Sequence, residues 1–149
     1  MELKEELYTK CLGSLDSRFE TVQRTVSELQ EALLSETKSS AGDKHETGRA
    51  MLQLEREKAG YQLLEIQKVK EILSKIDVTK TNKNISLGSI IYTSKANYFI
   101  AISAGAFKVN FDTFYAISSN TPMGKLLMSK TVGDTIVFRN ESIVIEKVI

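Results

Sequence analysis

The sequence has few of the residues from which disulfide frameworks and metal cages are built. Among 149 residues there are one cysteine (Cys11), one histidine (His45), one proline and no tryptophan. A single cysteine cannot form an internal disulfide, and one histidine cannot supply a multi-histidine metal site. We therefore expect the fold to be stabilised by packing of its side chains.

Long hydrophobic runs are also absent. Hydrophobic residues make up 42% of the chain and charged residues 26%, and no apolar run reaches the roughly 18 residues that a membrane-spanning helix needs. The first residues, 1–6, are acidic and lack the apolar stretch of a signal peptide. We expect a cytoplasmic protein without membrane contact, of one ordinary or two small domains. This length excludes a multidomain enzyme with a large enclosed cleft.

The chain has almost no net charge. It carries 20 basic and 19 acidic residues, a formal net charge of +1, so no global field draws it onto bare nucleic acid. Residues 1–84 contain 14 of the basic and 15 of the acidic groups, and residues 85–149 contain 6 and 4. We infer that a role with nucleic acid would act through another protein, and that the two parts differ in structure.

The first part has the pattern of a coiled coil. From Glu2 to about Thr37 there is no proline and a single glycine, Gly13. The apolar residues advance by alternating steps of four and three, the spacing of a narrow helical seam; they are Tyr8, Leu12, Leu15, Phe19, Val22, Val26, Leu29 and Leu33. This pattern predicts a long helix that packs against one partner stripe.

A second long helix is predicted from about Lys44 to Ile76. Small and turn-forming residues at 39–43 separate it from the first. Its apolar stripe is less regular and consists of Met51, Leu52, Leu54, Ala59, Leu63, Ile66, Val69, Leu73 and Ile76. Two helices of similar length joined by a short tip, near 38–46, form an antiparallel hairpin roughly 50 Å long. Because the stripes pair within one chain, we expect a monomer.

The second part is predicted to be a small β-rich domain. A polar linker at 77–84 precedes short β-branched and aromatic runs at Ser89–Thr93, Tyr98–Ser103, Phe114–Ser118, Thr135–Arg139 and Ser142–Val148. These runs fit a four- or five-stranded antiparallel sheet. A short helix is predicted to start after the N-cap Thr121, with Pro122 at its first position, and to cover one face of the sheet. The fold class is therefore α+β.

Three segments of the chain resemble the Gre family of bacterial transcript-cleavage factors. They are the tip sequence 42–47 (GDKHET), the run 117–127 (ISSNTPMGKLL) and the following 130–134 (KTVGD). The resemblance covers essentially the full chain. It implies a coiled-coil hairpin over 1–76 that enters the secondary channel of RNA polymerase, and an FKBP-like domain over 85–149 that docks on the polymerase. Transcription elongation and DNA binding are the functional terms that go with this resemblance.

Asp43 and Glu46 match the acidic pair of that family. Three residues apart at a helix start, they point the same way. Mg²⁺ prefers oxygen ligands, so two carboxylates can secure a loosely held ion. The resemblance implies that the pair completes a Mg²⁺ site within the polymerase and assists cleavage of a backtracked transcript, with only indirect contact to nascent RNA. The polymerase remains the enzyme, and the chain alone binds no cofactor.

Two alternatives to this role are open. Asp43 and Glu46 also form a variant of the capping box, in which each side chain bonds a backbone N–H of the other's residue. Where the family has apolar or acidic residues near the pair, this chain has Lys44 and Arg49, which can approach RNA phosphates; Thr47 and Ala50 also depart from the family pattern. A non-catalytic coiled-coil interaction module, or a channel-occupying regulator without cleavage activity, is therefore the alternative function.

The remaining candidates favour structural roles. His45 beside two acids suggests a private metal site, but ligands within one short tip lack fixed geometry, so an exposed imidazole is favoured. Cys11 has no evident base or oxyanion groups and is interpreted as packing. A prolyl-isomerase pocket is usually floored by tryptophan, which the chain lacks. Its aromatic residues are instead expected to fill the core, with some exposed for docking; they are Tyr92, Tyr98, Phe99, Phe107, Phe111, Phe114 and Tyr115.

Overall fold

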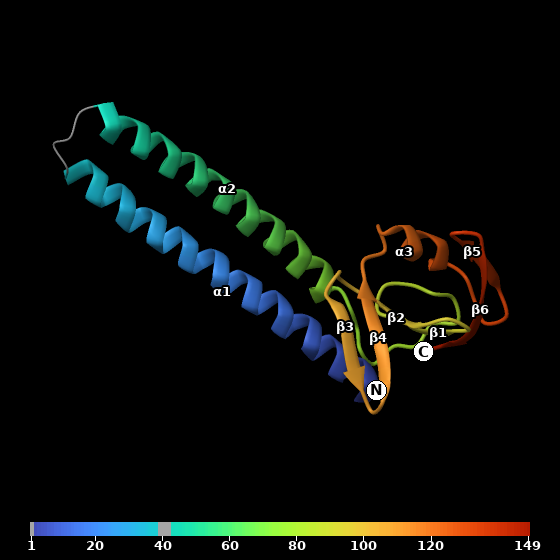
Figure 1. The fold of residues 1–149 in the computed structure, drawn as a ribbon. Coiled ribbons are helices and arrows are strands. Elements are labelled where there is room, and N and C mark those ends of the chain that lie inside the picture. Colours follow the sequence, from blue (N-terminus) through green and yellow to red (C-terminus); the bar gives the residue numbers. More distant parts are fainter. Residues whose placement is uncertain (1, 39–42) are drawn as a thin grey trace. The chain divides into compact units, whose positions relative to one another are not determined.

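Two long helices precede a sheet in the chain, as the sequence predicts. The computed structural model describes the backbone of residues 2–38 and 43–149 and the side chains of 2–36 and 47–149. Helix α1 spans Glu2–Lys38 and helix α2 spans Asp43–Ser74 (Figure 1). The centre of the predicted tip, 39–42, lies outside the described residues.

The chain forms two compact units. One consists of Leu15–Val69, and the other of Met1–Ser14 together with Lys70–Ile149. The ends of both helices therefore belong to the same compact unit as the strands. The domains predicted from the sequence, 1–76 and 85–149 with a linker between them, stay a prediction.

In the unit Leu15–Val69, the two helices run antiparallel side by side (Figure 1). Leu15, Leu29, Ala59 and Ile66 are its buried apolar residues. The predicted stripe on α2 is wrong at Met51 and Leu54, which are 62% and 66% exposed. The buried positions on α2 are seven residues apart, at 59 and 66, and Leu54 lies five residues before the first of them. At 100° per residue it therefore points to a different side of the helix.

The first turns of α1 bury a stripe beside the predicted one. Leu7 and Cys11 are fully buried, whereas the predicted seam residues Tyr8 and Leu12 are only partly buried. The spacing of four residues is helical, as predicted, but the fully buried face is shifted by one residue. This part of α1 belongs to the compact unit of the strands, so its surroundings are not those of a simple two-helix seam.

The second compact unit contains a six-stranded sheet. Its strands are β1 (Ile90–Thr93), β2 (Asn97–Ile100), β3 (Gly105–Val109), β4 (Asp112–Ile117), β5 (Thr135–Phe138) and β6 (Glu141–Val148), in the order β3-β4-β2-β1-β6-β5. All neighbouring pairs are antiparallel except β2 and β4, which are parallel. The predicted α+β class is thus confirmed.

The prediction of a four- or five-stranded antiparallel sheet is wrong in two respects. Strand β3 is an additional edge strand, and its sequence, Gly105-Ala106-Phe107-Lys108-Val109, has little β-branched character. Its pairing with β4 holds it in place through the backbone. Because β3 intervenes in the chain between β2 and β4, these two neighbouring strands run in the same direction.

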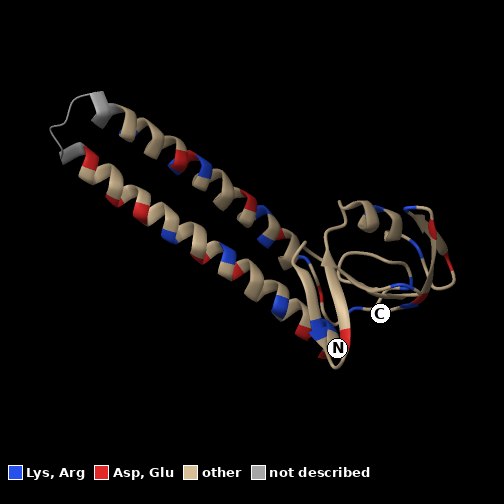
Figure 2. Cartoon of the chain, viewed as in Figure 1, with Lys and Arg blue, Asp and Glu red and all other residues tan. Residues whose placement is uncertain are grey.

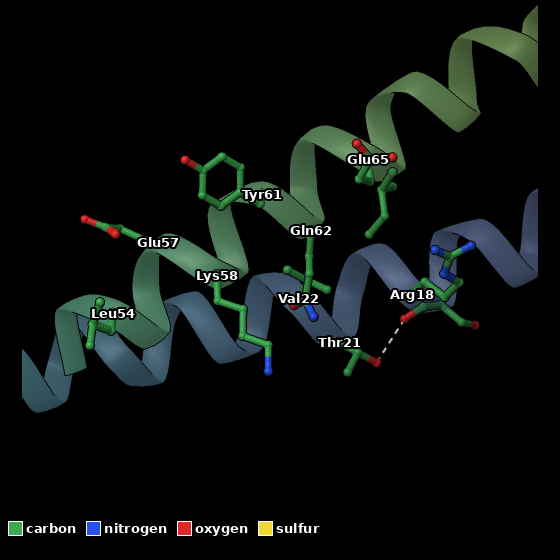
Figure 3. Close-up of a pocket in the computed structure, with 11 residues that line it drawn as sticks. Arg18, Thr21, Val22, Leu54, Glu57, Lys58, Tyr61, Gln62 and Glu65 are labelled. Atoms are coloured by element: carbon green, nitrogen blue, oxygen red, sulfur yellow. Dashed lines mark hydrogen bonds between the residues drawn. The ribbon is translucent and has the colours of Figure 1, made fainter. Parts of the chain in front are cut away.

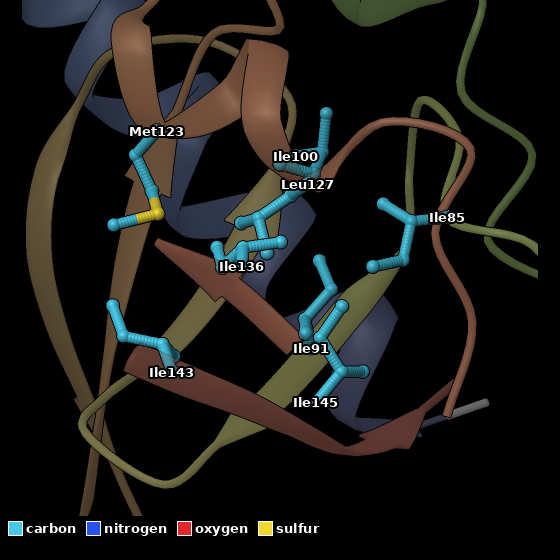
Figure 4. Close-up of a cluster of buried hydrophobic side chains, with 8 residues drawn as sticks. All are labelled: Ile85, Ile91, Ile100, Met123, Leu127, Ile136, Ile143 and Ile145. Atoms are coloured by element: carbon cyan, nitrogen blue, oxygen red, sulfur yellow. The ribbon is translucent and has the colours of Figure 1, made fainter. Parts of the chain in front are cut away.

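The short helix α3 (Pro122–Leu127) covers one face of the sheet, as predicted. A core of eight buried residues lies between α3 and the strands (Figure 4). It consists of Ile85, Ile91, Ile100, Met123, Leu127, Ile136, Ile143 and Ile145. Over the described residues, no helix has both the length and the hydropathy needed to cross a membrane.

Candidate functional site

The predicted acidic pair lies in the first turn of α2. The helix begins at Asp43, so Asp43 and Glu46 both fall in its first four residues. The structure does not describe the side chains of residues 37–46, which include Lys44 and His45. Acidic residues are favourable at this end of a helix because unpaired backbone N–H groups give it a partial positive charge. This position suits capping, and the role of the pair in binding a cation stays a prediction.

A third carboxylate lies one turn further along, on the partner helix. A Cβ built on Gly48 of α2 would lie 3.3 Å from Oε1 of Glu36, near the end of α1. The glycine therefore gives the partly buried Glu36 carboxylate room against α2. The sequence interpretation did not single out Glu36. The signal that could have found it is Gly48 inside the second predicted helix, because in an antiparallel hairpin that glycine lies opposite Glu36.

The surroundings of the pair carry charges of both signs. Arg49 and Thr47 are exposed, one turn from the acidic pair. Both helices of the unit Leu15–Val69 carry basic and acidic residues (Figure 2), but the last charged side chains of α1 that the structure describes, those of Glu28, Glu31 and Glu36, are all acidic. Among the described side chains, no three metal-ligating groups form a cluster that could hold an ion.

The run 117–127 has a structural explanation in α3. The hydroxyl of Thr121 accepts a hydrogen bond from the backbone N–H of Gly124 at 3.1 Å, so the predicted N-cap is confirmed, with Pro122 opening the helix. The same hydroxyl donates to the carbonyl oxygen of Ser118 at 2.7 Å. A Cβ at Gly124 would clash with that carbonyl. These residues are therefore required to attach α3 to the sheet.

The run 130–134 forms a turn rather than a site. A carboxylate oxygen of Asp134 accepts from the backbone N–H of Thr131 at 2.9 Å, and Gly133 has a φ of +92° that favours glycine. The hydroxyl of Thr131 donates to the carbonyl oxygen of Lys83 at 3.1 Å. The turn thus fastens the end of the predicted linker, 77–84, to the segment before β5.

The aromatic residues divide into core and surface. Phe99 and Phe114 are buried, and Phe114 packs edge-on against Tyr92 with 5.7 Å between ring centroids. Tyr115 is 44% exposed and Phe111 is fully exposed. Burial raises the pKa of Cys11 to about 12, so its thiol is un-ionised at neutral pH and suited to packing.

An apolar groove of about 750 Å³ lies between α1 and α2 in the unit Leu15–Val69 (Figure 3). The exposed side chains of Leu54 and Tyr61 line it from α2, and Val22 lines it from α1. Charged residues of both signs also border the groove; the basic ones are Arg18 and Lys58, and the acidic ones are Glu57 and Glu65. This groove explains where part of the irregular stripe on α2 points.

Comparisons with known proteins add one similarity. No protein-family model matches the sequence, and no curated protein matches it. Among solved structures, that of the transcription factor Gfh1 is similar, with 21% sequence identity and a TM-score of 0.35. The match covers 95% of this chain and 92% of that chain. A similarity at this level does not assign a family or a function.

Proposed function

We propose that this protein is a transcription elongation factor of the Gre type that binds RNA polymerase. Its helical hairpin would enter the secondary channel and its sheet domain would dock on the polymerase surface. There it would assist the polymerase's own cleavage of backtracked transcripts, with Asp43 and Glu46 as the assisting groups. The protein would act as an accessory factor, and any contact with RNA or DNA would come through the polymerase complex.

One observation carries this proposal: α2 begins at Asp43. The acidic pair of the GDKHET sequence therefore occupies the first turn of the second helix in a two-helix hairpin, the position that a tip function requires. Were the helix to begin several residues later, the same short motif would be an ordinary loop sequence. The N-cap at Thr121 adds support, because it places the start of α3 inside 117–127, the second run that resembles the Gre family.

The chemistry of the pair fits Mg²⁺. Two carboxylates are hard oxygen ligands, and such an ion commonly takes only one or two of them from any one protein. Asp43 and Glu46 would hold the ion together with ligands of the polymerase. When bound there, Mg²⁺ supplies activation of water for hydrolysis.

A non-catalytic regulator that occupies the same channel is the second candidate. Lys44 and Arg49 favour it, because cations beside the acidic pair weaken its attraction for Mg²⁺. Arg49 is exposed and so is available to phosphate groups. Both candidates share the binding partner and differ in whether transcript length changes.

The test compares the wild type with the double variant Asp43→Asn, Glu46→Gln on purified core RNA polymerase. An amide keeps most of the size and one oxygen acceptor but removes the charge that would hold the ion. We expect both proteins to fold and to bind the polymerase with similar affinity. Only the wild type should shorten transcripts in stalled, backtracked complexes.

A matched control removes two charges elsewhere on the same helix. Glu55 and Glu57 are exposed on α2, further from the tip, and Glu55→Gln, Glu57→Gln should retain full stimulation. Binding without any change in transcript length would favour the second candidate. A wild-type protein that does not bind core polymerase would overturn both.

A further inference from the structure

The turn between β3 and β4 carries an unusual residue. The last backbone pair of this hairpin is Val109 with Asp112, so the turn consists of Asn110 and Phe111 alone. Their φ values are +51° and +76°. A two-residue hairpin turn with two positive φ values is the type that strongly prefers Asn-Gly, because glycine adopts the second position without strain. Here the glycine position is filled by a phenylalanine.

The aromatic ring of Phe111 is not buried against the rest of the protein. Its side chain is fully exposed, more than any other large apolar side chain described, the next being Tyr61 at 70%. A bulky residue with positive φ is a backbone outlier that costs free energy. The free protein therefore bears a strained turn and an exposed aromatic ring at one position. Because the ring is fully exposed, its burial does not offset the cost of the turn.

The hairpin that carries the ring is firmly held. Five backbone pairs join β3 to β4, from Gly105 with Ala116 to Val109 with Asp112. Val109, next to the turn, is buried, as is Phe114 on the opposite strand. The ring is thus presented on a rigid element, so little conformational entropy is lost when it is bound.

Acidic groups predominate around the turn. Asn110 and Lys108 share a surface groove of about 590 Å³ with the first turns of α1, within the same compact unit. The exposed carboxylates here belong to Glu2, Glu5, Glu6 and Asp112, and the ammonium groups to Lys10 and Lys108. This excess of negative charge disfavours nucleic acid and anionic membranes. It complements a protein surface with basic side chains.

We infer that Phe111 is an aromatic anchor that inserts into an apolar socket with a basic rim on a protein partner. Resting on the proposed function, that partner is core RNA polymerase, and the anchor is one point of contact of the sheet domain. Exposed aromatic residues that fill a partner's pocket commonly dominate binding energy. The ring then repays in the complex what the strained turn costs in the free chain.

The test is Phe111→Gly, because glycine removes the ring and also fits the turn. We expect its melting temperature to equal or exceed that of the wild type. Its Kd for core polymerase should rise about 30-fold, as for the loss of a central aromatic contact. Phe111→Asn, which tolerates positive φ, should behave in the same way. Val137→Ala, at another exposed apolar position (62%), should leave the Kd unchanged.

The outcomes separate this inference from the proposed function. If the wild type and Phe111→Gly bind polymerase equally, the anchor is overturned while the proposed function stands. If the wild type does not bind, both are overturned. A clear loss of melting temperature in both Phe111 variants would show a structural role and overturn the anchor. The anchor would also be overturned if Phe111→Gly weakened binding of a labelled single-stranded RNA but left the Kd for polymerase unchanged.

Discussion

The Nζ of Lys4, in the first turn of α1, donates a hydrogen bond to the carbonyl oxygen of Lys80 at 2.5 Å. The Lys4 residue is only 3% exposed. Burial lowers the pKa of its ammonium below the ordinary value, and the carboxylate of Asp77 offsets part of this effect. One buried cation thus fastens the start of α1 to the segment that leads from α2 to the sheet.

Lys4 should make stability depend on alkaline pH. Since its pKa is lowered in the folded state, the unfolded chain binds more protons in the range just below the ordinary value of 10.5. The unfolding free energy of the wild type should therefore rise with pH as 10.5 is approached, relative to Lys4→Met. Urea unfolding of both proteins at pH 7.5, 9 and 10 measures this difference. A difference that is constant or falls with pH would contradict the burial of a charged Lys4.

Cys11 should be protected from thiol reagents. It is fully buried, and its pKa is raised to about 12, so little thiolate forms in the folded state. At pH 8, labelling by a chromogenic disulfide should be about 100-fold or more slower in the native protein than in urea. Above pH 9 the folded state retains a proton that the unfolded thiol loses, so stability should fall with pH by up to about 1.4 kcal/mol per unit. Cys11→Ala should lack this fall, and equal labelling rates would contradict the packing role.

Two glycines should respond oppositely to alanine. A Cβ at Gly124 would clash with the Ser118 carbonyl, so Gly124→Ala should lower stability by about 1–3 kcal/mol. Gly13 lies inside α1 with nothing within 4 Å of an added Cβ. There alanine should raise stability by about 0.5–1 kcal/mol through its better helix propensity. Thermal unfolding measures both, and a neutral Gly124→Ala would mean that α3 does not pack closely on Ser118.

The sequence predicts the elements of this fold better than their pairing. Heptad spacing locates α1, a less regular apolar stripe locates α2, and the Thr121-Pro122 pair locates the start of α3. Strand β3 is missed because its stability comes from bonds to β4, which local propensity does not express. The parallel pairing of β2 with β4 follows only from that missing strand.

The candidate sites differ in the same way. Asp43 and Glu46 can be identified because they belong to a short motif. Glu36 can be identified only from the register of the two helices, which places it opposite Gly48. In the sequence, Phe111 is one of seven aromatic residues expected to fill the core, with some exposed for docking. Only the register of β3 with β4 shows that it occupies the glycine position of a tight turn.

The most direct test of the proposed function is the Mg²⁺ dependence of transcript cleavage in a stalled, backtracked complex, read as RNA length over time. If Asp43 and Glu46 help to hold the ion, the wild-type protein should lower the Mg²⁺ concentration that gives half-maximal cleavage, relative to polymerase alone. Asp43→Asn, Glu46→Gln should abolish this shift while still binding. Identical Mg²⁺ curves with and without bound wild-type protein would contradict the account.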